Sequence, residues 1–109
     1  MVINIATDYS KNPGGRLIRE GEYSGEDFRK KMLYPCYLES VSLQEPSTVN
    51  LDGGYGYGSS FLEEAFGGLA RETKDRNVLK IKIVSNEEPR LIEDIKRYME
   101  VALNEKKNK

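Results

Sequence analysis

Hydrophobic positions fall into two kinds of pattern that alternate along the chain. Short apolar runs typical of strands occur at residues 2–5, 48–51 and 78–84. Between and after these runs, apolar side chains recur at the three- and four-residue spacing of amphipathic helices. Leu17 and Ile18 follow a turn-forming Pro-Gly-Gly segment, so a further strand is expected there, paired with the first as a hairpin. The pattern predicts an α/β domain with a small mixed sheet of about four strands and three to four helices.

The helical segments carry recognisable start and stop signals. Ser24 is placed to cap the first helix, and Pro35 is expected to break or kink it. Ser60 and Glu63 have capping-box spacing at the start of the second helix. The third is expected to follow Pro89. The apolar face of the second helix is predicted to consist of Phe61, Leu62, Ala65, Phe66, Leu69 and Ala70, and that of the third of Leu91, Ile92, Ile95, Tyr98, Met99, Ala102 and Leu103. Gly67 and Gly68 indicate close packing against the sheet or an early helix end.

Length and charge narrow the class of protein. The chain of 109 residues predicts one domain over residues 1–109, with residues 103–109 as a frayed basic tail. The net charge of -1, from 17 basic and 18 acidic residues, argues against nucleic acid as a partner. The sequence shows neither a secretion signal nor an apolar stretch that would span a membrane, so a cytoplasmic location is expected.

Missing residue types exclude several kinds of chemistry. The chain has no histidine, which removes the commonest general base and the nucleophilic triads that depend on it. Cys36 is the single cysteine and is expected to be a small buried apolar residue rather than a nucleophile. We therefore expect no catalytic residue, no metal site and no cofactor, and interpret the protein as a non-enzyme.

The most informative segment is a Gly/Tyr loop that connects the predicted strand at residues 48–51 to a helix opened by two serines. This arrangement directs hydroxyls and free backbone N–H groups toward one point, where an anion or a partner would sit. The expected partner or ligand surface consists of Asp52, Gly53, Gly54, Tyr55, Gly56, Tyr57 and Gly58, and the candidate phosphoacceptors are Ser59 and Ser60. The two tyrosines suit a contact surface, although partly packed rings in an ordinary loop are an equal alternative.

The run Gly-Ser-Ser-Phe-Leu-Glu-Glu-Ala-Phe-Gly-Gly-Leu at residues 58–69 resembles the signature of the bacterial STAS-like domain of unknown function. The upstream run Tyr-Ser-Gly-Glu-Asp-Phe-Arg at residues 23–29, together with Pro35, resembles the second motif of that family. More distantly, the order of elements resembles the STAS fold of anti-sigma-factor antagonists. The resemblance implies a STAS-like single domain.

In the anti-sigma-factor antagonists this helix opens with Asp-Ser-Ser-Gly, and an anti-sigma factor with a histidine-kinase-type ATPase fold phosphorylates the first serine. That serine corresponds to Ser59 here, while Gly58 replaces the aspartate and Phe61 replaces the glycine. Asp52 is the nearest carboxylate that would substitute for the missing one. The resemblance implies a non-catalytic regulatory interaction module whose partner is an ATPase or kinase, and it leaves a homo-oligomer open.

Other interpretations of the same residues stay open at this point. The serines would also serve simply as helix caps. Alternatively, the Gly-rich loop would hold a phosphorylated small molecule in a small enzyme or sensor, although it lacks the Lys-Ser/Thr ending of a P-loop. Glu63 and Glu64 are expected to face solvent. A gathering of Arg16, Arg19 and Arg29 near the loop is a further hypothesis, which would create an anion site.

Overall fold

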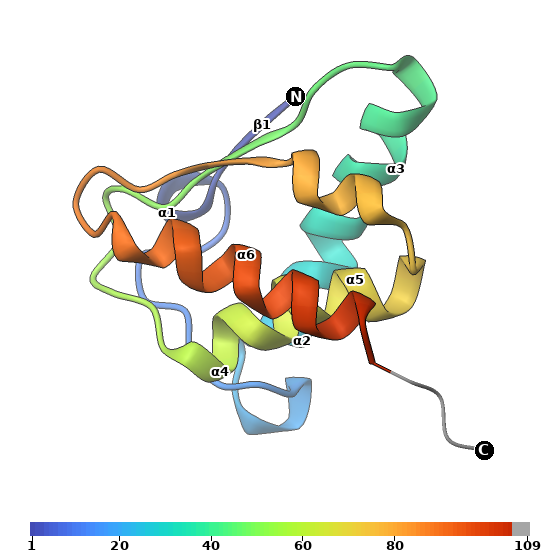
Figure 1. The fold of residues 1–109 in the computed structure, drawn as a ribbon. Helices are drawn as coiled ribbons and strands as arrows, with labels where there is room; N and C mark the ends of the chain where they lie inside the picture. Colours follow the sequence, from blue (N-terminus) through green and yellow to red (C-terminus); the bar gives the residue numbers. More distant parts are fainter. Residues whose placement is uncertain (106–109) are drawn as a thin grey trace.

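A three-stranded parallel sheet organises the computed structural model, which describes residues 1–105 (Figure 1). The strands are β1 (Val2–Asn4), β2 (Thr48–Asn50) and β3 (Lys82–Val84), with β2 in the centre. In register, Val49 lies opposite Ile3 on one side and Ile83 on the other. Both crossovers between parallel strands contain helices, as a βαβ topology requires. The α/β class is confirmed, whereas the predicted mixed sheet of about four strands is wrong.

Most of the remaining secondary structure is helical, and several consecutive helical elements join into two long helices. The helical elements are α1 (Ile5–Asp8), η1 (Ile18–Glu20), α2 (Gly25–Phe28), η2 (Arg29–Leu33), α3 (Tyr34–Leu43), α4 (Ser59–Leu62), η3 (Glu63–Gly67), α5 (Gly68–Thr73), η4 (Arg76–Lys80) and α6 (Arg90–Leu103). η2 and η3 are π-helical turns, so α2–η2–α3 and α4–η3–α5 are two continuous helices. Each contains one wide turn within an otherwise α-helical path.

The predicted N-terminal hairpin does not form. Leu17 precedes η1 rather than opening a strand, and the chain leaves β1 directly into α1. The backbone of this loop instead pairs with the start of α2, where Gly25 N donates to Gly15 O at 3.0 Å and Glu26 N donates to Arg16 O at 3.0 Å. Because the Gly15 and Arg16 carbonyl groups accept hydrogen bonds from α2, they are not available to pair with β1.

The last predicted strand is shorter than its sequence pattern suggests. Residues 76–80 form the 3₁₀ helix η4 because the Asp75 side chain caps it, accepting from Asn77 N at 3.0 Å. Val78, expected on a strand, is fully buried from this helix. Only the second half of the apolar run forms β3.

Pro35 does not interrupt its helix. It is exposed and lies two residues after Leu33, the last residue of η2, whose wider turn accommodates the proline ring and the missing N–H. The predicted start of this helix is confirmed, because Ser24 Oγ accepts from Asp27 N at 3.1 Å. The helix therefore runs from its cap through the proline to Leu43.

The core lies where the helices meet one another and the sheet. α6 packs along η3 and α5, and α2 packs against α4 and η3. Three buried phenylalanines, Phe28, Phe61 and Phe66, join the two long helices. α6 extends through Leu103, so the predicted frayed tail does not begin there. Its lysines, Lys106, Lys107 and Lys109, lie outside the described residues.

Candidate functional site

The Gly/Tyr loop leaves the central strand at the edge of the sheet where the carboxyl ends of all three strands meet. Asp52 anchors the loop to the segment after β3, accepting from Asn86 N at 3.1 Å, Asn86 Nδ2 at 3.0 Å and Glu87 N at 3.0 Å. These donors, the Glu87 N–H above all, lower the pKa of Asp52. Gly53 N in turn donates to Glu87 Oε1 at 2.9 Å. The carboxylate of Asp52 therefore holds the loop in place.

The two tyrosines of the loop have different environments. Tyr55 is 79% exposed, and its N–H donates to Lys11 O at 2.8 Å. Tyr57 is half-buried, donates its hydroxyl to Leu51 O at 2.8 Å and packs against the Phe61 ring. Burial, with smaller contributions from two nearby carboxylates, raises the pKa of Tyr57 to about 12. Tyr55 is thus available as a contact residue, whereas Tyr57 supports the loop from inside.

Two glycines of the loop adopt backbone conformations that side chains rarely allow. Gly53 has φ +93° and Gly56 has φ +137°. Gly53 also lies close to α1, since a Cβ added to it would be 3.5 Å from the Ala6 methyl group. The glycines let the chain turn sharply between the end of β2 and the start of α4.

Ser59 and Ser60 are the first two residues of the helix α4–η3–α5, and both are exposed. Gly58 occupies the N-cap position, and no side chain in the described part of the chain caps the helix. The predicted capping box is therefore wrong, because Ser60 lies one residue beyond Ser59 inside the helix and Glu63 binds elsewhere. The first N–H groups of the helix have no intrahelical partners, and Ser59 and Ser60 belong to this first turn.

The vacant cap suggests a stabilising substitution. Gly58 has φ -76° and ψ 153°, and a Cβ added there would meet nothing within 4 Å. We expect Gly58→Asp to raise the free energy of unfolding by about 0.5–1 kcal/mol, because it supplies a cap and removes a flexible glycine from the unfolded chain. Urea denaturation of this variant beside Gly58→Ala tests the capping effect. Equal stability of the two variants would contradict it.

Glu63 and Glu64 do not face solvent as predicted. Glu63 pairs with Arg16 at 2.5 Å and with Arg71 at 2.6 Å. Glu64 pairs with Arg29 at 2.8 Å, and Arg29 Nη1 also donates to Glu64 O at 2.5 Å. All of these side chains are at least partly buried. The two glutamates therefore belong to an ion-pair cluster that joins the loop before η1 to both long helices.

This cluster also contains two of the three arginines that were expected to gather near the Gly/Tyr loop. Arg16 and Arg29 do come together, but on η3 rather than at the loop, and carboxylates oppose both of their charges. Arg29 Nε lies 3.3 Å from Glu72 Oε1, within ion-pair range but without the alignment of a hydrogen bond. Arg19 is exposed and takes no part in these pairs. The predicted anion site is not formed.

Ion pairing at Glu63 predicts a pH dependence of stability. Arg71, and then Arg16, hold the pKa of Glu63 below its ordinary value of 4.5. A carboxylate with a lowered pKa stabilises the fold above its unfolded pKa, and that contribution disappears as the pH falls through the folded pKa. At pH 7 we expect the free energy of unfolding of the wild type to be higher than that of Glu63→Gln by about 1–2 kcal/mol.

Urea denaturation at several pH values should show that difference shrinking below pH 4.5. The exposed Glu93 on α6 offers a matched control, since Glu93→Gln removes a carboxylate of the same type outside the cluster. A difference between wild type and Glu63→Gln that persists unchanged at about pH 3 would contradict the assignment.

The single cysteine, possible metal ligands and possible membrane spans were also considered. Cys36 is partly buried against the core, and burial raises the pKa of its thiol, which disfavours the reactive thiolate. Within residues 1–105, no group of three or more Cys, Asp or Glu side chains is arranged to hold a metal ion. None of the helices in the described part of the chain combines the length and apolarity that crossing a bilayer demands.

Comparison with known proteins places the fold and most of the site within one family. The model of the family described as STAS-like domain of unknown function (DUF4325) matches residues 24–90, more than half of the chain. The match begins at the cap of α2 and includes β2, the Gly/Tyr loop, both serines and β3. Neither the curated proteins nor the solved structures gave a significant match. The chain belongs to the family of STAS-like domains of unknown function.

Proposed function

We propose that this chain is a non-catalytic protein-interaction module of a regulatory partner switch, and that residues 52–60 form the face that docks the partner. The observation that carries the proposal is the exposure of Ser59 and Ser60 and the lack of a capping role for either side chain. Both are exposed at the start of a long helix, and neither caps it. Their hydroxyls thus lack the structural role that serines most often have at this position.

Phosphorylation of Ser59 would be tolerated by the fold and would change the docking face. A phosphoserine carries up to about two negative charges, which the N-terminal end of a helix stabilises through its dipole and unpaired N–H groups. The same charge would alter the electrostatics of the proposed docking face, to which Ser59 belongs. Ser59 is therefore the proposed phosphoacceptor, with Ser60 as the alternative acceptor.

The partner is proposed to be an ATPase or kinase, by analogy with the antagonists that this family resembles. Tyr55 is the natural anchor, because an exposed tyrosine offers a large contact area with few rotatable bonds to immobilise. Asp52 and Tyr57 contribute indirectly, since their bonds to Asn86 and Leu51 hold the loop that presents Tyr55. Gly54, Gly56 and Gly58 complete the face as backbone surface.

A phosphorylated small molecule is a poorer occupant of the loop. The cavity beside it has a volume of about 160 Å³, below the roughly 300 Å³ of typical ligand sites. Three carboxylates line it, from Asp52, Glu87 and Glu88, and none of the basic side chains within residues 1–105 does. A phosphate entering this cavity would face like charges, so the sensor interpretation is not retained.

Quantitative affinity capture from cells that express the chain tests the proposal. Tagged wild type, Tyr55→Ala and Ser59→Asp would be compared with Ile18→Ala, which truncates an exposed apolar residue of η1 outside the docking face. We expect one protein to be retained by wild type and Ile18→Ala and to fall at least about tenfold for the other two variants. Identical retained proteins for all four chains would contradict the proposal. Tyr55 is the position tested, because Tyr57 supports the loop and its loss would disturb the loop itself.

A further inference from the structure

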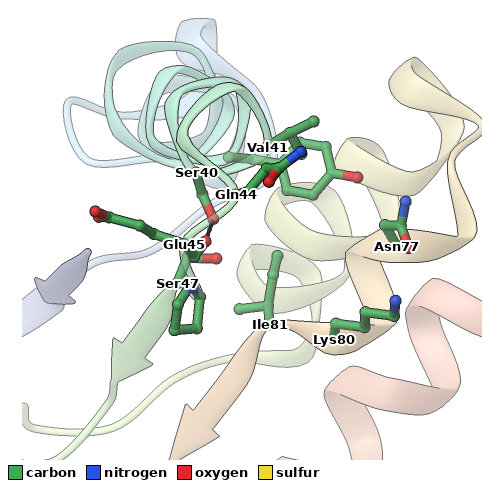
Figure 2. Close-up of a pocket in the computed structure, with 10 residues that line it drawn as sticks. Ser40, Val41, Gln44, Glu45, Ser47, Asn77, Lys80 and Ile81 are labelled. Carbon is green, nitrogen blue, oxygen red and sulfur yellow. Dashed lines mark hydrogen bonds between the residues drawn. The ribbon is translucent and has the colours of Figure 1, made fainter.

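A second cavity lies at the opposite end of the sheet from the Gly/Tyr loop. It has a volume of about 390 Å³ and opens between the C-terminal end of α3 and η4, next to the residues that enter β2 and β3 (Figure 2). Tyr37, Val41, Pro46 and Ile81 give it an apolar lining. We call this cavity the α3–η4 hollow. Its volume falls within the roughly 300–1,000 Å³ of small-molecule sites.

Hydrogen bonds hold the walls of the hollow in place. Tyr37 donates its hydroxyl to Asp75 Oδ2 at 2.6 Å, which ties the ring to the residue that caps η4. The turn after α3 is closed twice, because the Ser40 hydroxyl donates to Glu45 O and Glu45 N donates to Ser40 O at 3.0 Å. The hollow is therefore preformed, as ligand sites usually are.

One nearly buried hydroxyl of the lining has no partner in the protein. Ser47 is 6% exposed, and its carbonyl accepts from Lys82 N at 2.9 Å, which anchors the residue to the sheet. None of the hydrogen bonds within residues 1–105 involves the Ser47 side chain. Its oxygen is not sealed in the core, so it is reached from the hollow. A ligand there can bond to this hydroxyl without breaking an existing contact.

Two charged side chains lie on opposite sides of the hollow. Lys80 ends η4 on one side, and Glu45 follows α3 on the other (Figure 2). Within residues 1–105 neither of them is in an ion pair. Lys80 is thus available to an anionic group, whereas Glu45 would repel a second anionic group at the far side. The charges favour a ligand with a single negative charge at the Lys80 end.

We propose that the α3–η4 hollow binds a small hydroxy-carboxylate, a molecule with an apolar body, a carboxylate at one end and a neutral hydroxyl at the other. Figure 2 shows Ile81 between Ser47 and Lys80, so the two polar contacts are separated by an apolar surface. The carboxylate pairs with Lys80, the apolar body lies against Ile81 and Val41, and the hydroxyl bonds to Ser47.

This site is separate from the proposed docking face. The hollow lies where the chain enters β2 and β3, while residues 52–60 follow the exit from β2. A molecule in the hollow leaves Tyr55 and Ser59 accessible. The ligand site therefore stands or falls independently of the partner switch.

Isothermal titration calorimetry of the purified full chain tests the proposal with three probes. They are para-hydroxyphenylpropionate, phenylpropionate without the hydroxyl, and the uncharged amide of the first. We expect para-hydroxyphenylpropionate to bind saturably with a Kd below about 1 mM. Phenylpropionate should bind about fivefold more weakly and the amide about tenfold more weakly, because each lacks one of the two polar contacts.

Variants of the lining assign each contact to a residue. Ser47→Ala should weaken binding of the hydroxylated probe about fivefold and leave phenylpropionate binding unchanged. Lys80→Met should abolish the preference for the carboxylate over the amide. Ser42→Ala and Lys96→Met are matched controls, because both residues are exposed and lie outside the lining. Circular dichroism confirms that each variant is folded.

Three calorimetric results would overturn the proposal. They are no saturable binding of any probe up to about 10 mM, an affinity that both Ser47→Ala and Lys80→Met leave unchanged, and an amide that binds as tightly as the carboxylate. Amide chemical shifts give the location, since those of Ser47 and Ile81 should move with the probe. Shifts that move at Tyr55 and Ser59 instead would place the probe at the Gly/Tyr loop and equally overturn the proposal.

Discussion

Replacing Phe61 by alanine is expected to lower the free energy of unfolding by about 3–5 kcal/mol, a large fraction of the roughly 5–15 kcal/mol that stabilises a typical domain. The Phe61 ring is fully buried, with its centroid 5.8 Å from that of Phe28 and 6.2 Å from that of Tyr57. It follows the two serines directly, so it fixes the start of their helix onto the core. Its removal would leave a cavity at the base of the docking face.

Guanidinium denaturation monitored by circular dichroism measures this loss. Tyr55→Ala removes a neighbouring aromatic ring that is exposed, so it should change stability by no more than about 0.5 kcal/mol. A loss below about 1 kcal/mol for Phe61→Ala would show that the ring does not anchor the helix. Phe61 stands where the antagonists have glycine, and its burial gives that departure a structural reason.

The second large effect is expected at Gly25, the first residue of α2. A Cβ added there would overlap the Phe61 carbonyl oxygen and lie 3.0 Å from Glu64 Cβ. The backbones of the two long helices therefore meet without space for a methyl group. We expect Gly25→Ala to destabilise the protein by about 2–4 kcal/mol, although alanine alone favours a helix over glycine by about 1 kcal/mol.

Gly21→Ala is the matched control, because a Cβ on Gly21 meets nothing within 4 Å and its backbone is extended. Thermal and urea denaturation should place this variant within about 0.5 kcal/mol of wild type. A neutral or stabilising Gly25→Ala would mean that the two helices separate at little cost, and would contradict the close contact that positions Glu64 beside Arg29.

Helix faces could be predicted from the sequence because their signal is local. All six residues predicted for the apolar face of the second helix are buried, from Phe61 to Ala70. In α6, Leu91, Ile95, Met99 and Ala102 are buried at the predicted spacing. Helical periodicity depends on neighbours three and four residues apart, so it needs no knowledge of the rest of the fold.

Strands were harder to predict than helices, because the strand that each one pairs with lies far away in the sequence. Leu17 and Ile18 have the composition of a strand, but the adjoining backbone is satisfied by bonds from Gly14 N to Tyr23 O and from Gly25 N to Gly15 O. Competition between a hairpin and these bonds is decided by tertiary contacts, which composition does not report. The parallel pairing of β1, β2 and β3 is likewise decided by tertiary contacts, so composition could not predict it either.

The sequence suggested residues 52–60 as the candidate site, but the surroundings of each side chain there could be described only from the fold. Arg16 and Glu63 are 47 residues apart, so no local pattern could reveal their ion pair. One available signal was the pair of helical glycines, since a Cβ on Gly68 would collide with the guanidinium of Arg29. Gly68 thus leaves room for an arginine rather than for the sheet, while a Cβ on Gly67 would meet the Glu63 carboxylate, so the predicted packing against the sheet is wrong.

Site-specific photo-crosslinking tests the central proposal most directly. A photoreactive amino acid would replace either Tyr55 or the exposed Ile18 in the chain expressed in cells, with and without Ser59→Asp. The account predicts a crosslink to one partner protein from position 55, none from position 18, and loss of the crosslink with Ser59→Asp. The same partner captured equally from both positions, or a crosslink at 55 that Ser59→Asp leaves unchanged, would contradict it.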